Sequence, residues 1–315
     1  MNAHRETDAF DADVVAAFGR HLLVRDAAGG ELRARPSGRK LSIVCGDRVR
    51  CEPDRKHDEL LIVEVLPRRT LLARTNLRGA SEPVVANITQ LVVVVAPLPA
   101  PDFFIVDRYL CAATAAGIAG VIAVNKSDLG DGLDGGELEA YARAGYSHLA
   151  CSAKAGAGLE GLKQALTDAV SVLVGQSGVG KSSLVAALLP ETEIATGELM
   201  REEEGRHTTT ASRAYPLFAT RDGGTLIDSP GVRDFAPAID QLDERTLGFP
   251  EIARLASSCR FGDCRHMQEP DCAVSAAVED GSLHARRYES YRRLRRRYAD
   301  LVEARGPASR GRRQR

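Results

Sequence analysis

The sequence predicts an α/β fold in which a mainly parallel, doubly wound sheet lies between a small N-terminal β-barrel and a helical, metal-binding C-terminal segment. Three observations lead to this prediction. Apolar runs of strand length alternate with helical spacing from about residue 79 to 240, short β-rich runs precede them, and a Cys/His cluster lies in the basic segment that follows. The 315 residues are enough for two or three domains, with expected limits at 1–78, 79–240 and 241–315.

The first segment carries short β-rich runs separated by turn residues, the pattern of a small antiparallel barrel. The runs are 19–25, 31–35, 47–51 and 60–66. Basic side chains are interleaved with them, as in a barrel that binds RNA. A generic SH3-like barrel gives the same pattern, so both interpretations stay open. The basic residues are Arg33, Arg35, Arg39, Lys40, Arg48 and Arg50.

In the second segment, buried strands alternate with amphipathic helices, which indicates a mainly parallel sheet covered on both faces. The expected strands are 91–95, 121–124, 148–150 and 170–174, and the expected helices are 104–116, 137–144, 159–169 and 181–189. Ligands of such sheets bind beyond the carboxyl ends of the strands. Each nucleotide motif described next falls at such an end.

A phosphate-binding loop of the pattern G-x-x-x-x-G-K-[ST] follows the strand at 170–174 and opens a helix. Its backbone N–H groups and the start of the helix suit a β-phosphate. Lys181 is expected to bridge the β- and γ-phosphates, as a catalytic residue, and Ser182 to bind Mg²⁺. The expected nucleotide contacts here are Gly175, Gln176, Ser177, Gly178, Val179, Gly180, Lys181, Ser182 and Ser183.

Two further motifs select the base. The first is N-K-x-D, formed by Asn125, Lys126, Ser127 and Asp128, and the second is formed by Ser152, Ala153 and Lys154. The carboxylate of Asp128 can accept hydrogen bonds from the ring N–H and the exocyclic amine of guanine, whereas adenine presents an acceptor there. These loops therefore predict GTP and GDP as ligands.

The residues that sense the γ-phosphate follow the phosphate loop. Asp228 is expected near Mg²⁺ and the Gly231 N–H at the γ-phosphate, in a D-x-x-G motif. Val232 stands where many GTPases have a water-orienting Gln, so another group must align the water or hydrolysis is slow. His207 is the candidate for that group, with a plain polar loop residue as the alternative. Thr209 is the expected Mg²⁺ and γ-phosphate ligand, and the neighbouring Thr208 is the second choice.

The order of these motifs is unusual, because both base motifs precede the phosphate loop and the γ-phosphate motif follows it. In the usual GTPase the base motifs come last. The second segment is therefore predicted to be a P-loop GTPase domain with a circularly permuted motif order.

The third segment contains Cys259, Cys264, His266 and Cys272 within a short stretch. Three thiolates and one imidazole are the ligand set of a closed, structural Zn²⁺ site. The other four cysteines stand beside apolar residues and are expected to be buried thiols. They are Cys45, Cys51, Cys111 and Cys151.

Composition places the chain among ordinary globular proteins, with 44% hydrophobic and 27% charged residues. No apolar run reaches the ~18 residues that would span a bilayer, so a cytoplasmic protein without membrane contact is expected. A monomer is expected as well. The net charge of −1 conceals a basic end: residues 285–315 hold twelve Arg and three acidic residues. A polyanionic partner and a merely solvated tail both explain this end.

The chain resembles the RsgA (YjeQ) family of bacterial GTPases in four features taken together. They are the permuted motif order, the Gly205–Thr209 segment, the Asp228–Phe235 segment and the Cys/His spacing. The resemblance covers nearly the whole chain. It implies that the barrel is an OB-fold and that the protein hydrolyses GTP late in maturation of the small (30S) ribosomal subunit. It also implies stimulation by that subunit, contact with its rRNA, and a catalytic role for the His that matches His207.

Two other functions are compatible with these residues. One is a permuted GTPase that serves the large subunit or another RNA, against which the zinc-ligand spacing argues. The other is a nucleotide-gated RNA-binding module with negligible turnover, which Val232 motivates. Hydrolysis measured with and without purified subunits distinguishes all three.

Overall fold

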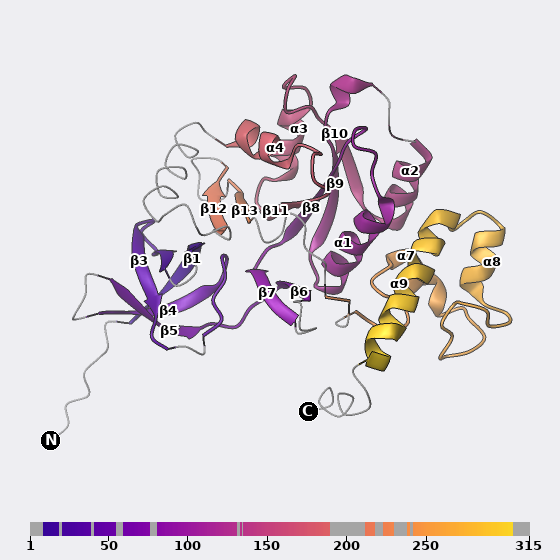
Figure 1. The fold of residues 1–315 in the computed structure, drawn as a ribbon, viewed down its shortest axis with the longest axis horizontal. Coiled ribbons are helices and arrows are strands. Elements are labelled where there is room, and N and C mark those ends of the chain that lie inside the picture. Colours follow the sequence, from indigo (N-terminus) through magenta and orange to yellow (C-terminus); the bar gives the residue numbers. More distant parts are fainter. Residues whose placement is uncertain are drawn as a thin grey trace.

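The computed structural model describes residues 9–18, 21–38, 41–54, 59–75, 81–130, 133, 135–189, 212–217, 223–229, 238–239 and 242–304. Three parts lie in a row in Figure 1: the barrel, the α/β sheet with its helices, and the C-terminal helices. Within the described residues, the strands of the first two parts form one sheet of eleven strands, and the hairpin β6–β7 stands apart from it.

The N-terminal barrel has five strands in the order β1-β2-β3-β5-β4, and pairing of β1 with β4 closes it. All neighbours are antiparallel except β3 and β5. Buried and exposed side chains alternate along β4, where Val49 and Cys51 face the barrel core while Arg48 and Arg50 face solvent. The predicted barrel is confirmed, although its first strand was not expected. The strands are β1 Phe10–Phe18, β2 His21–Arg25, β3 Glu31–Pro36, β4 Arg48–Pro53 and β5 Leu60–Val65.

A hairpin connects the barrel to the α/β sheet. Its strands are β6 Leu71–Thr75 and β7 Ser81–Ala86, paired antiparallel. The limit expected at 78/79 falls between these two strands. Because the strands pair with each other, the hairpin extends across that limit.

The α/β sheet has the order β10-β9-β8-β11-β13-β12, and its strands are parallel up to β13, with β12 antiparallel. Separate apolar clusters fill its two faces, which confirms the doubly wound arrangement. The strands are β8 Gln90–Val95, β9 Ala119–Val124, β10 Ser147–Ala150, β11 Val170–Val174, β12 Ser212–Pro216 and β13 Thr225–Asp228. The helices are α1 Phe103–Ala115, η1 Ser127–Leu129, α2 Gly135–Ala144, α3 Leu159–Ala165 and α4 Lys181–Leu188.

The barrel and the α/β sheet are joined by backbone pairing. Strand β12 pairs antiparallel with β1, so that Ala16 lies opposite Arg213 and Ala17 opposite Ser212. The guanidinium of Arg213 also forms an ion pair with Glu31 of the barrel at 3.3 Å. Strand β12 therefore belongs to both parts of the molecule.

The C-terminal part consists of α7 Pro250–Ala256, α8 Ala273–Glu279 and α9 Ala285–Ala304 around its own apolar cluster. None of the described helices combines the length and apolar character needed to cross a membrane. The arginine-rich end is only partly solvated, because α9 turns some arginines inward. Arg287 is 1% exposed and Arg295 6% exposed.

A buried ionic cluster fixes this part to α1 and α2, and we call it the docking cluster: Asp107, Glu137, Glu251, Arg286 and Arg287. Asp107 of α1 accepts from Arg286 and Arg287, each at 2.5 Å, and Arg286 also pairs with Glu137. Arg287 reaches Glu251 of α7 at 2.6 Å. Burial alone would lower the pKa of Arg287, but Asp107 and then Glu251 hold it well above its ordinary value. These charges are buried only because they are paired.

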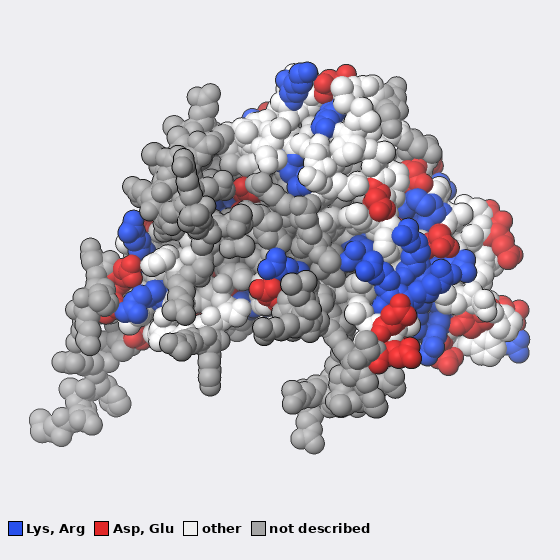
Figure 2. Space-filling model, viewed as in Figure 1, with Lys and Arg blue, Asp and Glu red and all other residues white. Residues whose placement is uncertain are grey.

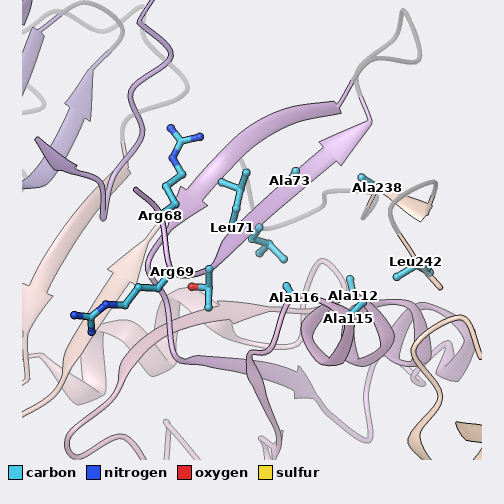
Figure 3. Close-up of a pocket in the computed structure, with 11 residues that line it drawn as sticks. Arg68, Arg69, Leu71, Ala73, Ala112, Ala115, Ala116, Ala238 and Leu242 are labelled. Carbon is cyan, nitrogen blue, oxygen red and sulfur yellow. The ribbon is translucent and has the colours of Figure 1, made fainter. Parts of the chain in front are cut away.

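A small cavity of about 230 Å³ lies where the hairpin, α1 and the chain leading to α7 meet. Figure 3 shows Ala112 and Ala115 of α1, and Ala116 just after it, facing the hairpin, with Ala238 and Leu242 at one side. The Ala238 N–H donates to the carbonyl of Ala73 at 3.2 Å. The segment that enters the C-terminal part is thus fastened to β6.

Candidate nucleotide-binding site and metal centre

The phosphate loop follows β11 and ends at α4, as predicted. Two of its glycines are required by close contacts. A Cβ at Gly175 would lie 2.2 Å from the carbonyl oxygen of Val94, and a Cβ at Gly180 would lie 2.3 Å from Nδ2 of Asn125. Both residues also have positive φ angles, 141° and 92°. The loop therefore packs backbone against the neighbouring strand end and base motif.

Lys181 lies inside this loop at the start of α4 and is 8% exposed. Its Nζ donates to the carbonyls of Gly175 at 2.6 Å and Gln176 at 2.7 Å. The neighbouring side chains of Ser182 and Ser183 are exposed. An ammonium group held beside the loop backbone, with hydroxyls at the helix start, is an arrangement suited to phosphate and a hard cation.

Asn125 joins three motifs at the end of β9. Its Nδ2 donates to the carbonyl of Val179 in the phosphate loop at 2.8 Å, and its Oδ1 accepts from the Ala153 N–H at 3.1 Å. Lys126 makes a second bridge, since its Nζ donates to the carbonyl of Gly178 at 2.7 Å. Sequence reasoning assigned both residues to the base alone. The structure gives them an additional role, because they hold the base loops against the phosphate loop.

Asp128 and Ser152 come together from the two base motifs. The hydroxyl of Ser152 donates to Oδ1 of Asp128 at 2.5 Å and accepts from the Ala155 N–H at 3.0 Å. This hydrogen bond is the main cause that lowers the pKa of Asp128, helped by Lys154 and Lys126. The Asp128 carboxylate is therefore ionised at neutral pH and oriented by a buried hydroxyl, as guanine recognition requires.

The γ-phosphate motif is described only at its start. Asp228 ends β13, beside the phosphate-loop strand, and is 8% exposed. The next residue, Ser229, shares a hydrogen bond with Ser212 at 2.7 Å between the hydroxyl oxygens. The structure thus brings Asp228 to the same sheet end as Lys181. The other predicted residues of this region lie outside the described residues: His207, Thr208, Thr209, Gly231 and Val232.

One contact of the phosphate loop was not expected. The side chain of Gln176 accepts from the backbone N–H of Asp102 at 2.9 Å. Asp102 in turn caps the start of α1 by accepting from the Phe104 N–H. The loop is therefore linked to the helix that carries the C-terminal part. The phosphate-loop pattern leaves the residue type at position 176 open, so the sequence contains no sign of this contact.

The four predicted metal ligands converge. The ligand atoms of Cys259, Cys264, His266 and Cys272 all lie within 4.8 Å of one another. Nδ1 of His266 is 3.4 Å from Sγ of Cys259 and 3.5 Å from Sγ of Cys272, and those two sulfurs are 4.0 Å apart. A tetrahedral ion with bonds of ~2.0 Å to nitrogen and ~2.3 Å to sulfur separates its ligands by about 3.5 to 3.8 Å. The cluster can therefore hold one metal ion.

Hydrogen bonds made by side chains also organise the loop around the Cys/His cluster. Glu269 accepts hydrogen bonds from the backbone N–H groups of Arg265, Met267 and Gln268. Burial opposes its ionisation, but these donors outweigh burial and lower the pKa of Glu269 to about 2. The Tyr288 hydroxyl of α9 donates to the carbonyl of His266 at 2.8 Å. Sequence reasoning missed the role of Glu269. The only sign of it in the sequence is an acidic residue within a loop, where a carboxylate can accept from nearby backbone N–H groups.

A parallel sheet with a phosphate loop, and base-recognition loops that precede it in sequence, define the class of circularly permuted P-loop GTPases. Within that class, the profile of the RsgA GTPase family matches residues 65–237. The chain belongs to this family and is a GTP-hydrolysing enzyme.

Relatives and solved structures agree with this assignment. Proteins named Small ribosomal subunit biogenesis GTPase RsgA, from Ectopseudomonas mendocina and Azotobacter vinelandii, are each 42% identical to the chain. Each match covers 89% of this chain and 83% of the relative. The crystal structure of YjeQ from Thermotoga maritima has a TM-score of 0.70 and 29% identity, covering 93% of this chain and 99% of that one. YloQ, titled a circularly permuted GTPase, has a TM-score of 0.69 and 25% identity, with coverage of 95% and 98%.

Proposed function

We propose that the chain acts on the small (30S) ribosomal subunit as a late assembly factor whose GTP hydrolysis that subunit stimulates. The observation that carries this proposal is the similarity, over 89% of the chain, to proteins named for small-subunit biogenesis. The cytoplasm, where that subunit is assembled in bacteria, is the expected location, and the protein is expected to act as a monomer. The expected domains remain 1–78, 79–240 and 241–315.

In the proposed nucleotide complex, the phosphate loop from Gly175 to Ser183 surrounds the phosphates and Lys181 exchanges its carbonyl contacts for phosphate oxygens. Mg²⁺, which neutralises phosphate charge when bound, would be held by Ser182, Thr209 and Asp228. This proposal is supported by the positions of Lys181 and Asp228. Lys181 begins the helix that follows β11, and Asp228 ends the adjacent parallel strand β13. Guanine is selected by Asp128, which Ser152 orients.

Hydrolysis needs a group that aligns water with the γ-phosphate, and the side chain of Val232 has no hydrogen-bonding atom for this task. We assign the task to His207, which lies between the phosphate loop and Asp228 in sequence. Gly231 would contact the γ-phosphate through its N–H. The products are GDP and phosphate.

The metal is proposed to be one structural Zn²⁺, because three thiols and an imidazole form a closed ligand set with no position left for a substrate. Burial raises the pKa of the Cys264 thiol to about 12. In the same cluster, burial would raise the pKa of the Cys272 thiol. Hydrogen bonds, first of all from the Ser275 N–H, outweigh burial and lower this pKa. A bound cation would hold all three sulfurs as thiolates.

Cys264→Ser is expected to lose the metal and to destabilise the residues beyond about 240, while GTP binding persists. Metal analysis should find one equivalent in the natural protein, and hydrogen exchange should speed up in α7, α8 and α9 of the variant. Cys45→Ser, at a buried thiol outside the cluster, is the control and should retain the metal. A metal-free preparation with a fully protected C-terminal part would contradict the proposal.

The RNA-contacting surface is proposed to include basic parts of the barrel and of the C-terminal segment. On the barrel, Arg48 and Arg50 are exposed but lie near the carboxylate of Asp11, at 3.5 and 3.3 Å. Arg35 pairs with Asp54. Arg33 is exposed without a described ion pair. Of these four arginines, only Arg33 therefore has no carboxylate partner within the described residues; Arg39 and Lys40 lie outside them.

The decisive experiment is steady-state GTP hydrolysis with and without purified ribosomal subunits. The small subunit should raise turnover, and it should bind the protein more tightly with a non-hydrolysable GTP analogue than with GDP. Stimulation by both subunits equally, or by neither, would contradict the assembly-factor role. Tight RNA binding with negligible turnover would instead support a nucleotide-gated binding module.

A further inference from the structure

The outer face of α9 carries exposed arginines that form no ion pair within the described residues. Its inward arginines are each paired with a carboxylate, as the docking cluster shows. By contrast, Arg293, Arg296 and Arg297 are exposed, and none lies within salt-bridge distance of a carboxylate in the part of the chain that the structure describes. Among the described residues, the inward arginines of this helix therefore have acidic partners, and Arg293, Arg296 and Arg297 do not.

Arg108 of α1 joins the same surface. Burial, and next the charge of Arg297, lower the pKa of Arg108. Its Nε is buried without a hydrogen-bond partner among the described atoms. The guanidinium of Arg293 is fixed as well, because it lies 4.1 Å from the ring centre of Phe104, also on α1. We call Arg108, Arg293, Arg296 and Arg297 the α1–α9 patch.

This arrangement is unfavourable for the isolated protein. Like charges are held near one another, and the guanidinium of Arg108 is partly desolvated. Arg293 cannot easily move away from this repulsion, because its attractive contact with the ring of Phe104 holds it in place. A solvated helix face would let these side chains spread apart. Figure 2 shows the Lys and Arg side chains gathered over α9, and the patch residues are all arginines. Guanidinium groups bind phosphate oxygens in a bidentate manner, which a lysine cannot do.

We propose that the α1–α9 patch binds the phosphodiester backbone of structured RNA. This inference rests on the proposed function, under which the RNA belongs to the small ribosomal subunit. Arg108 comes from the GTPase part and the other three residues from the C-terminal part. The patch is therefore complete only while the docking cluster holds the two parts together.

The test compares two triple variants of the full-length protein in binding to purified small subunits across a range of salt concentrations. In Arg108→Gln/Arg293→Gln/Arg297→Gln, affinity at low salt should fall about 10-fold or more. The slope of log affinity against log salt should become shallower by about 1 for each phosphate that the variant no longer neutralises. Unfolding temperature should change little, because the loss of the contact between Arg293 and Phe104 opposes the gain from removing repulsion.

The control variant removes the same charge elsewhere: Arg74→Gln/Arg143→Gln/Arg260→Gln, three arginines that are already paired with carboxylates. It should keep the natural affinity and slope. Basal GTP hydrolysis without subunits should be unchanged in both variants, since none of these side chains contacts the described residues of the nucleotide loops.

The outcomes separate the two proposals. If the natural protein does not bind the small subunit, both are overturned. If it binds but the patch variant has the same affinity and slope, the patch assignment is overturned while the function stands. A photoreactive side chain in place of Arg296 should cross-link to RNA, and attachment to ribosomal protein alone would overturn the RNA assignment.

Discussion

His207→Ala is expected to lower GTP turnover by ~10²-fold or more while GTP affinity stays nearly unchanged. A group that orients the attacking water acts mainly in the transition state, so its loss affects turnover and leaves ground-state binding intact. Single-turnover hydrolysis with the small subunit present, together with equilibrium binding of a non-hydrolysable analogue, measures the two quantities separately.

Two further variants define what this result means. Lys181→Ala should lose affinity as well as turnover, because its ammonium contacts phosphate in both the bound and the transition state. His148→Ala, at an exposed His of β10, should hydrolyse GTP like the natural protein. Poor GTP binding with normal turnover in the His207 variant would make His207 a binding residue and place the catalyst elsewhere.

Asp128→Asn is expected to weaken GTP binding roughly 10- to 100-fold and to improve binding of xanthosine triphosphate. The carboxylate accepts from two donors of guanine, whereas an amide offers one acceptor and one donor. Xanthine replaces the exocyclic amine by a carbonyl, so the amide complements its altered base edge. Because the pKa of Asp128 is lowered, the carboxylate is ionised throughout the neutral range, and the preference should not vary with pH there.

Competition titrations with both nucleotides measure this exchange of preference. Asp300→Asn, at an exposed carboxylate on α9 far along the chain, removes the same charge and should leave GTP affinity as it was. An unchanged GTP affinity in the Asp128 variant would remove this residue from base recognition. A similar loss for both nucleotides would indicate a collapsed loop, since Asp128 and Ser152 join the two base motifs.

Elements with a strong local signal could be predicted from the sequence. The phosphate-loop strand β11 is a continuous apolar run bounded by glycine, and the structure places it within one residue of expectation. Strand β1 was missed because Asp11 and Asp13 interrupt its apolar pattern and small alanines fill much of the rest. Hairpin β6–β7 was missed because Pro83 and a register shift after Leu72 weaken its alternation.

Contacts between distant segments could not be predicted. Arg287 stands in a run of basic residues and has the sequence signature of a solvated helix face. Its burial depends on Asp107 and Glu251, which come from two other helices. Similarly, the N-K-x-D pattern indicates guanine recognition but gives no sign that Asn125 also holds the phosphate loop. The convergence of the Cys/His cluster was predictable because the spacing of its residues is local and each residue type has a strong preference for a metal.

The pairing of β1 with β12 has a consequence for how the molecule can be divided. A fragment beginning at residue 79 would lack β1 and would expose β12 as an unprotected sheet edge, with free N–H and C=O groups beside the buried side chains of Ala214 and Tyr215. Such an edge is a template for strand addition from a second copy. The isolated GTPase fragment should therefore self-associate, although its nucleotide loops would be complete. In this family member the barrel therefore covers an edge of the sheet that carries the phosphate loop.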